Sequence, residues 1–296
     1  MYNQIASNKR KSVLLIFIFI IILVGVGYAY DWFYGSAQTP YVGIIMALVI
    51  SLLMTSISYF AGDKIALFAS GAKKISKEDN RYIYNLVENL CIAAGLSVPK
   101  IYIIDDPAIN AFATGRKPAL SSIAVTRGAI EKLGNEELEG VIAHELSHVK
   151  NFDIRFMMLV AVLVGAIAIL ANMFYRVGFI SGRDNDNNNR GGGILALVGL
   201  IFIIVSPIVA ELIKLAISRK REFLADASAA LLTRYPEGLA RALEKIGAEN
   251  RPLKRASGAT AHLFIANPFG RGRVMSLFST HPPLAERIKR LREMAR

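Results

Sequence analysis

The chain has 296 residues, of which 53% are apolar, and its mean hydropathy of +0.40 indicates membrane-spanning segments rather than a wholly water-soluble enzyme. The single cysteine, Cys91, excludes an intrachain disulfide framework and a zinc cluster held by thiolates. The net charge is +12, but no recognised nucleic-acid-binding motif accompanies it, so we expect no nucleic-acid partner. In a membrane protein such an excess of Lys and Arg gathers in cytoplasmic loops and at the anionic membrane surface.

Residues 1–62 are expected to hold two transmembrane helices. The segment 13–30 is uncharged, follows the basic run 9–11, and as a helix would be about 27 Å long, close to the thickness of a bilayer core. A cleaved signal peptide also starts with basic residues, but it is shorter and ends in small residues. This segment instead ends in aromatic residues typical of a membrane interface, Tyr28, Tyr30, Trp32 and Phe33. The second transmembrane segment is 41–61.

Residues 63–155 are predicted to form the first part of a water-exposed domain. Apolar periodicity predicts a helix over 77–94, and β-rich runs predict strands at 100–104 and 123–126. The small alternating residues between these strands suggest an exposed strand, to which a substrate peptide adds through backbone hydrogen bonds. The substrate-binding residues would then be Asn110, Ala111, Phe112, Ala113 and Thr114. A strand paired on both sides remains the alternative.

The sequence His-Glu-Leu-Ser-His at 144–148 is the strongest functional signal in the chain. On a helix starting near Asn135, His144 and His148 lie one turn apart on the same face and can bind one zinc ion, with Glu145 beside it. Zinc lowers the pKa of a bound water toward ~7, so Glu145 can act as general base and return the proton to the leaving amine. The alternative is a helix that only exposes two histidines.

Residues 156–217 are predicted to form a transmembrane hairpin. Its two apolar segments are 156–174 and 194–217, and an Asn-rich polar loop over 176–193 connects them. Core helices of a soluble domain are the alternative for both segments. Residues 218–296 are then the second part of the catalytic domain and are mostly helical.

Basic residues predict that both parts of the catalytic domain face the cytoplasm. They occur at the amino terminus, at Lys73 and Lys74 after the second span, and at 219–221 after the fourth, while the first loop has none. Arginines in the loop 176–193 weaken this asymmetry. The chain is therefore expected to be a multi-pass protein of the cell membrane.

Two histidines leave a catalytic zinc one protein ligand short. The third-histidine arrangement HExxHxxGxxH is excluded because Asn151 and Ile154 occupy the required positions. Five downstream glutamates are candidates: Glu211, Glu222, Glu237, Glu244 and Glu249. We choose Glu222 because Asp226, one turn later on the same face, can accept a hydrogen bond from a histidine Nδ1–H. The alternative is that Glu222 only pairs with a neighbouring arginine.

Two further residues are expected near the metal ligands. Asn151 comes three residues after the second histidine, and we expect it, like Asp226, to lie next to the metal ligands. His281, in a rigid Thr-His-Pro-Pro turn, could reach the cleft as an additional catalytic residue, although a surface histidine at a helix start fits the pattern equally well.

Four motifs together resemble the HtpX family of membrane-bound zinc endopeptidases: NAFATG at 110–115, HELSHVKN at 144–151, REFLADA at 221–227 and HPPLAERI at 281–288. The predicted fold is α+β, with a mainly helical zincin-like catalytic domain and a small β-sheet attached to about four transmembrane helices. The resemblance implies that the catalytic domain is of the gluzincin type and faces the cytoplasm. It also implies one Zn²⁺ per chain, bound by His144, His148 and Glu222, with Glu145 as general base. Its partners would be the lipid bilayer and polypeptide substrates, namely damaged or misfolded membrane proteins.

Other functions remain open at this stage. One is a zinc-binding membrane protein without turnover, against which the intact Glu145 argues. Another is a processing peptidase for a specific substrate, such as a prenylated protein. Cleavage within the bilayer is disfavoured, because charged residues such as Glu136, Glu139 and Lys150 flank the HExxH sequence.

Overall fold

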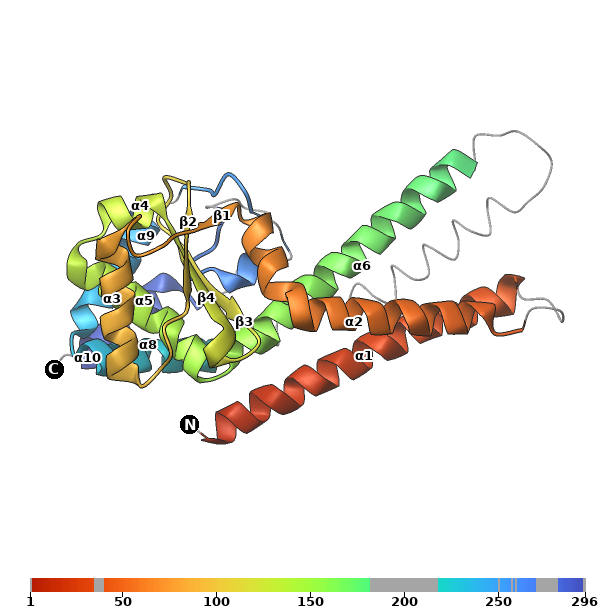
Figure 1. Ribbon diagram of the computed structural model, residues 1–296, viewed down its shortest axis with the longest axis horizontal. Helices are drawn as coiled ribbons and strands as arrows, with labels where there is room; N and C mark the ends of the chain where they lie inside the picture. The colour runs from red at the N-terminus through yellow and green to blue at the C-terminus, as the bar shows by residue number, and fades with distance from the viewer. Residues whose placement is uncertain are drawn as a thin grey trace.

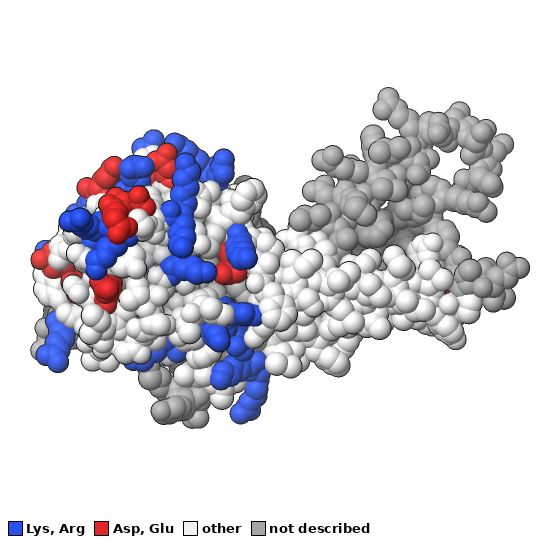
Figure 2. All heavy atoms as spheres, viewed as in Figure 1, with Lys and Arg blue, Asp and Glu red and all other residues white. Residues whose placement is uncertain are grey.

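The computed structural model describes residues 2–34, 40–181, 218–249, 251–256, 258, 260–269 and 282–294. A body of short helices around a small sheet lies at one end of the molecule, and three long helices, α1, α2 and α6, project from it (Figure 1). The charged side chains cover the body, whereas the surface of the projecting helices is almost entirely uncharged (Figure 2).

Helices α1 (Tyr2–Tyr34) and α2 (Val42–Ala69) pack along each other. Both are long and apolar enough to cross a membrane, over Ile5–Trp32 and Val42–Ala69. Two glycines allow the close approach, since a Cβ on Gly27 would lie 2.3 Å from the carbonyl oxygen of Gly43. The carboxylate of Asp31 accepts hydrogen bonds from the N–H groups of Gly43 (2.7 Å) and Ile44 (3.0 Å), which caps α2. The first two predicted spans are thus found as helices.

Helix α6 (Asp153–Ser181) contains the third predicted segment and packs against α1 through a buried apolar cluster that includes Leu15, Phe19, Phe156 and Leu159. It continues to Ser181, so the start of the predicted loop at 176 is helical. The fourth predicted segment, 194–217, lies outside the described residues. Within the described ranges the structure has two candidate membrane helices rather than four.

A four-stranded mixed sheet forms one layer of the body. Its strand order is β1 (Ala72–Lys74), β2 (Lys100–Ile104), β4 (Ser121–Thr126) and β3 (Ala111–Gly115). β2 and β4 are parallel, and the other two pairs are antiparallel. The 3₁₀ turn η1 (Pro118–Leu120) joins β3 to β4, and α4 (Arg127–Lys132) follows β4. β3 is the edge strand nearest α5.

Helices form the rest of the body: α3 (Arg81–Ala94), α5 (Asn135–Lys150), α8 (Arg219–Thr233), α9 (Pro236–Glu249), η2 (Ala261–Leu263) and α10 (Leu284–Met294). α3 begins where the Asn80 side chain accepts from the N–H of Ile83 and ends at Gly95, whose φ is 68°. Helix α5 is buried along its length and packs against β3, α8 and α9. The predicted strands, the predicted HExxH helix and the mainly helical fold with a small sheet are therefore confirmed.

Candidate active site

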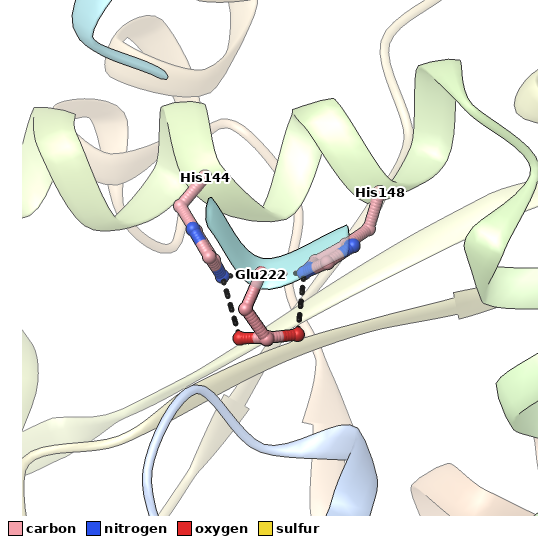
Figure 3. Close-up of side chains that lie close together, drawn as sticks. All are labelled: His144, His148 and Glu222. Atoms are coloured by element: carbon pink, nitrogen blue, oxygen red, sulfur yellow. Dashed lines mark hydrogen bonds and ion pairs between the residues drawn. The ribbon is translucent and has the colours of Figure 1, made fainter. Parts of the chain in front are cut away.

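The two histidines of α5 and Glu222 of α8 converge inside the body (Figure 3). The Nε2 atoms of His144 and His148 are 3.2 Å apart. The carboxylate oxygens of Glu222 lie 3.7 Å from His144 Nε2 and 3.5 Å from His148 Nε2. All three residues are buried. Glu222 reaches the histidines because α8 packs directly against α5.

This arrangement fits a zinc ion. Two nitrogens that each lie about 2.0–2.1 Å from a tetrahedral zinc are roughly 3.3 Å apart, which matches the Nε2 separation of 3.2 Å. Each ring binds a carboxylate through Nδ1, so each Nε2 is the nitrogen left to face Glu222. Two imidazoles and one carboxylate form a donor set typical of catalytic zinc.

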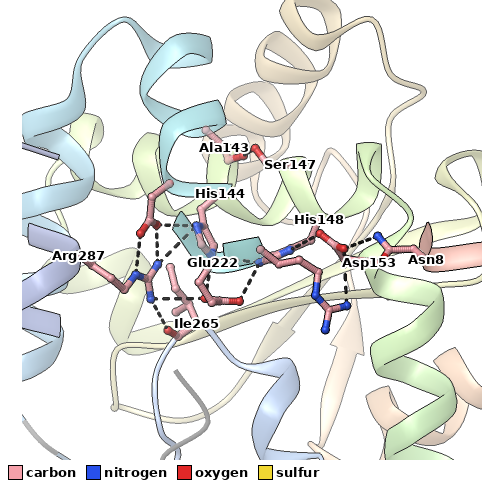
Figure 4. Close-up of polar contacts among 11 residues, drawn as sticks. Asn8, Ala143, His144, Ser147, His148, Asp153, Glu222, Ile265 and Arg287 are labelled. Atoms are coloured by element: carbon pink, nitrogen blue, oxygen red, sulfur yellow. Dashed lines mark hydrogen bonds and ion pairs between the residues drawn. The ribbon is translucent and has the colours of Figure 1, made fainter. Parts of the chain in front are cut away.

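Asp226 and Arg287 both lie beside His144, and Figure 4 shows Arg287 next to this ring. Asp226 Oδ1 lies 2.9 Å from His144 Nδ1. Arg287, 0% exposed, donates from Nε and Nη2 to the two oxygens of Asp226, at 2.9 and 2.7 Å, and from Nη1 to the carbonyl of Ile265 at 3.2 Å. Burial alone would raise the pKa of Asp226, but the charge of Arg287 and the contact with His144 hold that pKa well below its usual range. The site therefore keeps Asp226 as an anion.

Asp153 plays the same structural part for His148. Its Oδ2 lies 3.0 Å from His148 Nδ1, and its other oxygen accepts a hydrogen bond from the Asn8 side chain at 2.6 Å. Burial lowers the pKa of His148, but the hydrogen bond to Asp153 and the charge of Glu222 outweigh it and raise that pKa to about 9. The His148 ring of the metal-free protein is thus protonated at neutral pH.

A break between α5 and α6 brings Asp153 to this position. Phe152 has a φ of 60°, in the left-handed region, and α6 begins at the next residue. The chain turns there, so that Asp153 faces back toward His148 (Figure 4). Sequence reasoning did not identify Asp153, Arg287 or Asn8, because no glycine or proline marks the turn and the other two are distant in the sequence.

Glu145 lies beside the ligands and is almost completely buried. The main-chain N–H of Ala113 in β3 donates a hydrogen bond to its carboxylate. Burial, the largest effect, raises the pKa of Glu145 to about 8. The strand that was predicted to bind substrate thus lies directly against the predicted base.

The comparisons with known proteins identify the family. A model described as peptidase family M48 matches residues 77–295. The chain belongs to this family. It is 47% identical to the "Protease HtpX homolog" of Dictyoglomus turgidum, over 99% of this chain and 94% of that protein. It is 46% and 45% identical to the proteins of the same description from Caldanaerobacter subterraneus and Tropheryma whipplei, over 99% of this chain and 98% of each relative. The predicted family and metalloendopeptidase activity are confirmed.

The fold is also similar to that of one solved structure, at low sequence identity. Ste24p of S. mikatae superimposes with a TM-score of 0.51 at 19% identity, and the match covers 98% of this chain. The chain spans 66% of the length of that protein. The likeness therefore concerns the fold.

The edge strand β3 differs from the exposed strand that the sequence predicted. β3 is buried rather than exposed, and a second segment covers part of its outer side. The N–H of Ile265 donates to the carbonyl of Ala111 at 2.9 Å, and the Phe112 and Phe264 rings pack with centroids 4.9 Å apart. The Asn110 side chain donates to the carbonyl of Ala266 at 3.1 Å. The outer side of β3 is thus already paired at Ala111.

Asn151 and His281 were also predicted to lie near the metal ligands of this M48 site. Asn151 lines a cavity of about 240 Å³ together with residues of α3, α5 and α8. Its carbonyl oxygen accepts from Asn8. His281 lies outside the described residues. His262 is buried in η2, with Nε2 2.9 Å from the carbonyl oxygen of Met157.

Proposed function

We propose that this membrane metalloprotease uses one Zn²⁺ ion held by His144, His148 and Glu222. The observation that carries the proposal is the 3.2 Å separation of two Nε2 atoms opposite a buried carboxylate. Asp226 and Asp153 would fix the ring orientations, because each lies within hydrogen-bond distance of one Nδ1. When bound, the zinc would supply a water of low pKa and a Lewis acid for the peptide carbonyl.

Glu145 is the general base and acid in this proposal. It takes a proton from the attacking water and delivers it to the nitrogen of the departing amine. Burial raises the pKa of Glu145 and so makes its carboxylate a stronger proton acceptor than an exposed one. Arg287 lies 3.8 Å from Glu222 and balances the negative charge that Glu222 and Asp226 bring into the site.

The substrate backbone would pair with β3. Main-chain groups of alternate residues point to the same side of a strand, so the Ala113 carbonyl and the main-chain groups of Gly115 lie on the side where Ala111 pairs with Ile265, whereas the Ala113 N–H is donated to Glu145. We therefore narrow the predicted range 110–114 to a pairing site that begins at Ala113, while Asn110 and Phe112 hold the segment 264–266. A series of peptides methylated at successive backbone nitrogens tests this. Cleavage should fail only where the methyl group removes a pairing N–H.

If the enzyme binds the substrate through its backbone, it recognises few of the substrate's side chains. Such broad specificity suits a protease that removes damaged or misfolded membrane proteins. The direct test compares the degradation rate of one membrane protein in its folded and its destabilised form by the purified, full-length enzyme. The destabilised form should be degraded faster. Equal rates, or cleavage of one sequence only, would favour a dedicated processing peptidase.

The catalytic body would face the cytoplasm at the membrane surface. Aromatic and basic side chains meet where the long helices leave the body: Arg116 lies 5.0 Å from the ring centroid of Phe60, and Arg155 lies 5.7 Å from that of Tyr59. Basic residues are visible at the same junction in Figure 2. Such a belt is typical of the interface with an anionic inner leaflet.

Cysteine labelling tests this orientation and the transmembrane hairpin. In a background where Cys91 is replaced, a cysteine at Asn187 should react with an impermeant maleimide on intact cells. A cysteine at Lys74 should react only after lysis. An active enzyme whose Asn187 cysteine is inaccessible from outside would rule out the hairpin formed by the third and fourth segments.

A further inference from the structure

Asn8 of helix α1 reaches the metal site from outside the catalytic body. It lies five residues before the uncharged part of the first membrane segment, and only 3% of its surface is exposed. Its side-chain amide contacts residues more than 140 positions away in the sequence. Figure 4 shows Asn8 pointing from its own helix toward Asp153 and His148.

Both contacts of Asn8 are made at the break between α5 and α6. Its Nδ2 donates to the carbonyl oxygen of Asn151 at 3.0 Å and to Asp153 Oδ1 at 2.6 Å. These acceptors lie on either side of Phe152, the residue with the left-handed conformation. One amide therefore ties the end of the HExxH helix to the first residue of α6.

The second oxygen of Asp153 extends this contact to the metal ligand. Oδ2 lies 3.0 Å from His148 Nδ1. A neutral amide donor orients the carboxylate without cancelling its charge. Asp153 can therefore still accept a hydrogen bond from the Nδ1–H of His148. Arg221 Nη1 is farther from the same carboxylate, at 3.8 Å.

The position of Asn8 depends on the membrane helix. α1 packs on α6 through Leu15, Phe19, Phe156 and Val160, all buried in one cluster. Ser12, one turn after Asn8, is buried too, but among the described residues its hydroxyl bonds to the Asn8 carbonyl of the same helix, at 2.9 Å. Asn8 and Ser12 are thus both buried on α1. Of these two side chains, that of Asn8 contacts the residues around His148.

We propose that Asn8 is a positioning residue of the zinc site, and that α1 completes the site by fixing Asp153 and, through it, the ring of His148. The first membrane helix is then part of the catalytic unit as well as an anchor. The inference rests on the proposed zinc function, but it concerns metal affinity and geometry rather than turnover.

The test uses full-length protein in detergent and measures Zn²⁺ affinity by competition with a chelator, together with the visible spectrum of the Co²⁺-substituted protein. Outer-shell partners of a ligand contribute roughly 10- to 100-fold to metal affinity, and we expect Asn8→Ala to weaken binding by about 10-fold. Its Co²⁺ spectrum should change. Ser12→Ala, the matched control on the same helix, should leave both readouts unchanged.

A second variant covers the case in which Asn8→Ala folds poorly. Asn8→Asp has nearly the same shape but lacks the amide donor and adds a like charge beside Asp153, so it should weaken metal binding at least as much. Asp153→Asn provides the double-mutant cycle: Asn8→Ala should have little further effect on affinity in that background. Thermal unfolding of each variant in chelator separates loss of metal binding from loss of folding.

The outcomes separate the two proposals. Wild-type protein that binds no zinc contradicts the proposed function itself. Wild-type protein that binds zinc, together with folded Asn8 variants of equal affinity and unchanged Co²⁺ spectrum, overturns the role of Asn8 alone. Fully additive effects of Asn8→Ala and Asp153→Asn would show that Asn8 does not act through Asp153.

Discussion

Arg287 and Asp226 form a buried, two-point ion pair beside the first histidine of the HExxH motif. The donor–acceptor distances are 2.9 and 2.7 Å, and Arg287 also lies 3.8 Å from Glu222. A carboxylate that orients a metal ligand is thus itself oriented by an arginine from the HPPLAERI motif. This arginine links α10 to the site formed by α5 and α8.

Removing the arginine should destabilise the body. Arg287→Met leaves the Asp226 carboxylate buried without its partner, which costs about 3–5 kcal/mol of unfolding free energy. Arg287→Lys keeps the charge but lacks the two-point geometry and should cost less. Urea denaturation of the metal-free protein measures both. A Met variant as stable as the wild type would show that the pair is not important for folding.

The two carboxylates beside the histidines should also matter for metal affinity. Asp226→Asn and Asp153→Asn each alter the partner of one Nδ1–H, so zinc binding should weaken by roughly 10- to 100-fold. Asp105→Asn is the control, because Asp105 is exposed and, in the described part of the chain, pairs with Arg127 at the surface. If chelator competition gives the wild-type affinity for both site variants, these aspartates do not orient the ligands.

Zinc affinity should depend on pH through His148. The pKa of this histidine in the metal-free protein is raised to about 9, so below that pH a proton occupies the ring that the metal needs in its neutral form. The apparent affinity should therefore rise with pH up to about 9 and then level off. Calorimetry in buffers of different ionisation enthalpy should detect proton release on zinc binding at neutral pH. Absence of proton release would contradict a protonated His148.

Gly140 permits the close packing of the HExxH helix on α9. A Cβ at this position would lie 2.7 Å from the main-chain nitrogen of Leu239, and backbone cannot move aside as a side chain can. Gly140→Ala should therefore destabilise the protein by about 1–3 kcal/mol. Gly25→Ala, in α1, is the control, because its Cβ would meet no atom of another described element within 4 Å. Equal thermal stability of the two variants would mean that α5 and α9 can separate without cost.

The sequence predicted the parts of the site that have local signatures. The spacing of His144 and His148 requires only a helix, and Glu222 and Asp226 lie one turn apart on another. The contacts of Asp153 and Asn8 depend on a left-handed residue, Phe152, whose side chain does not favour that conformation. Tertiary packing alone determines it.

Long-range pairing explains the remaining differences. Alternating small residues at 110–115 identified an edge strand correctly, but nothing in that stretch shows that residues 264–266 cover its outer side. That contact joins segments about 150 positions apart, as the Asn110–Ala266 hydrogen bond illustrates. Likewise, Arg287 was visible only as part of a motif, and its contact with Asp226 required the packing of α10 on α8.

The most direct test of the zinc peptidase mechanism compares Glu145→Gln with Glu222→Ala in full-length protein, measuring bound zinc and casein degradation on the same samples. Glu145→Gln keeps all three ligands and removes the base, so zinc should stay stoichiometric while kcat falls by at least ~10²-fold. Glu222→Ala should lose both zinc and activity. Near-normal turnover by Glu145→Gln, or full and tight zinc binding by Glu222→Ala, would contradict the account.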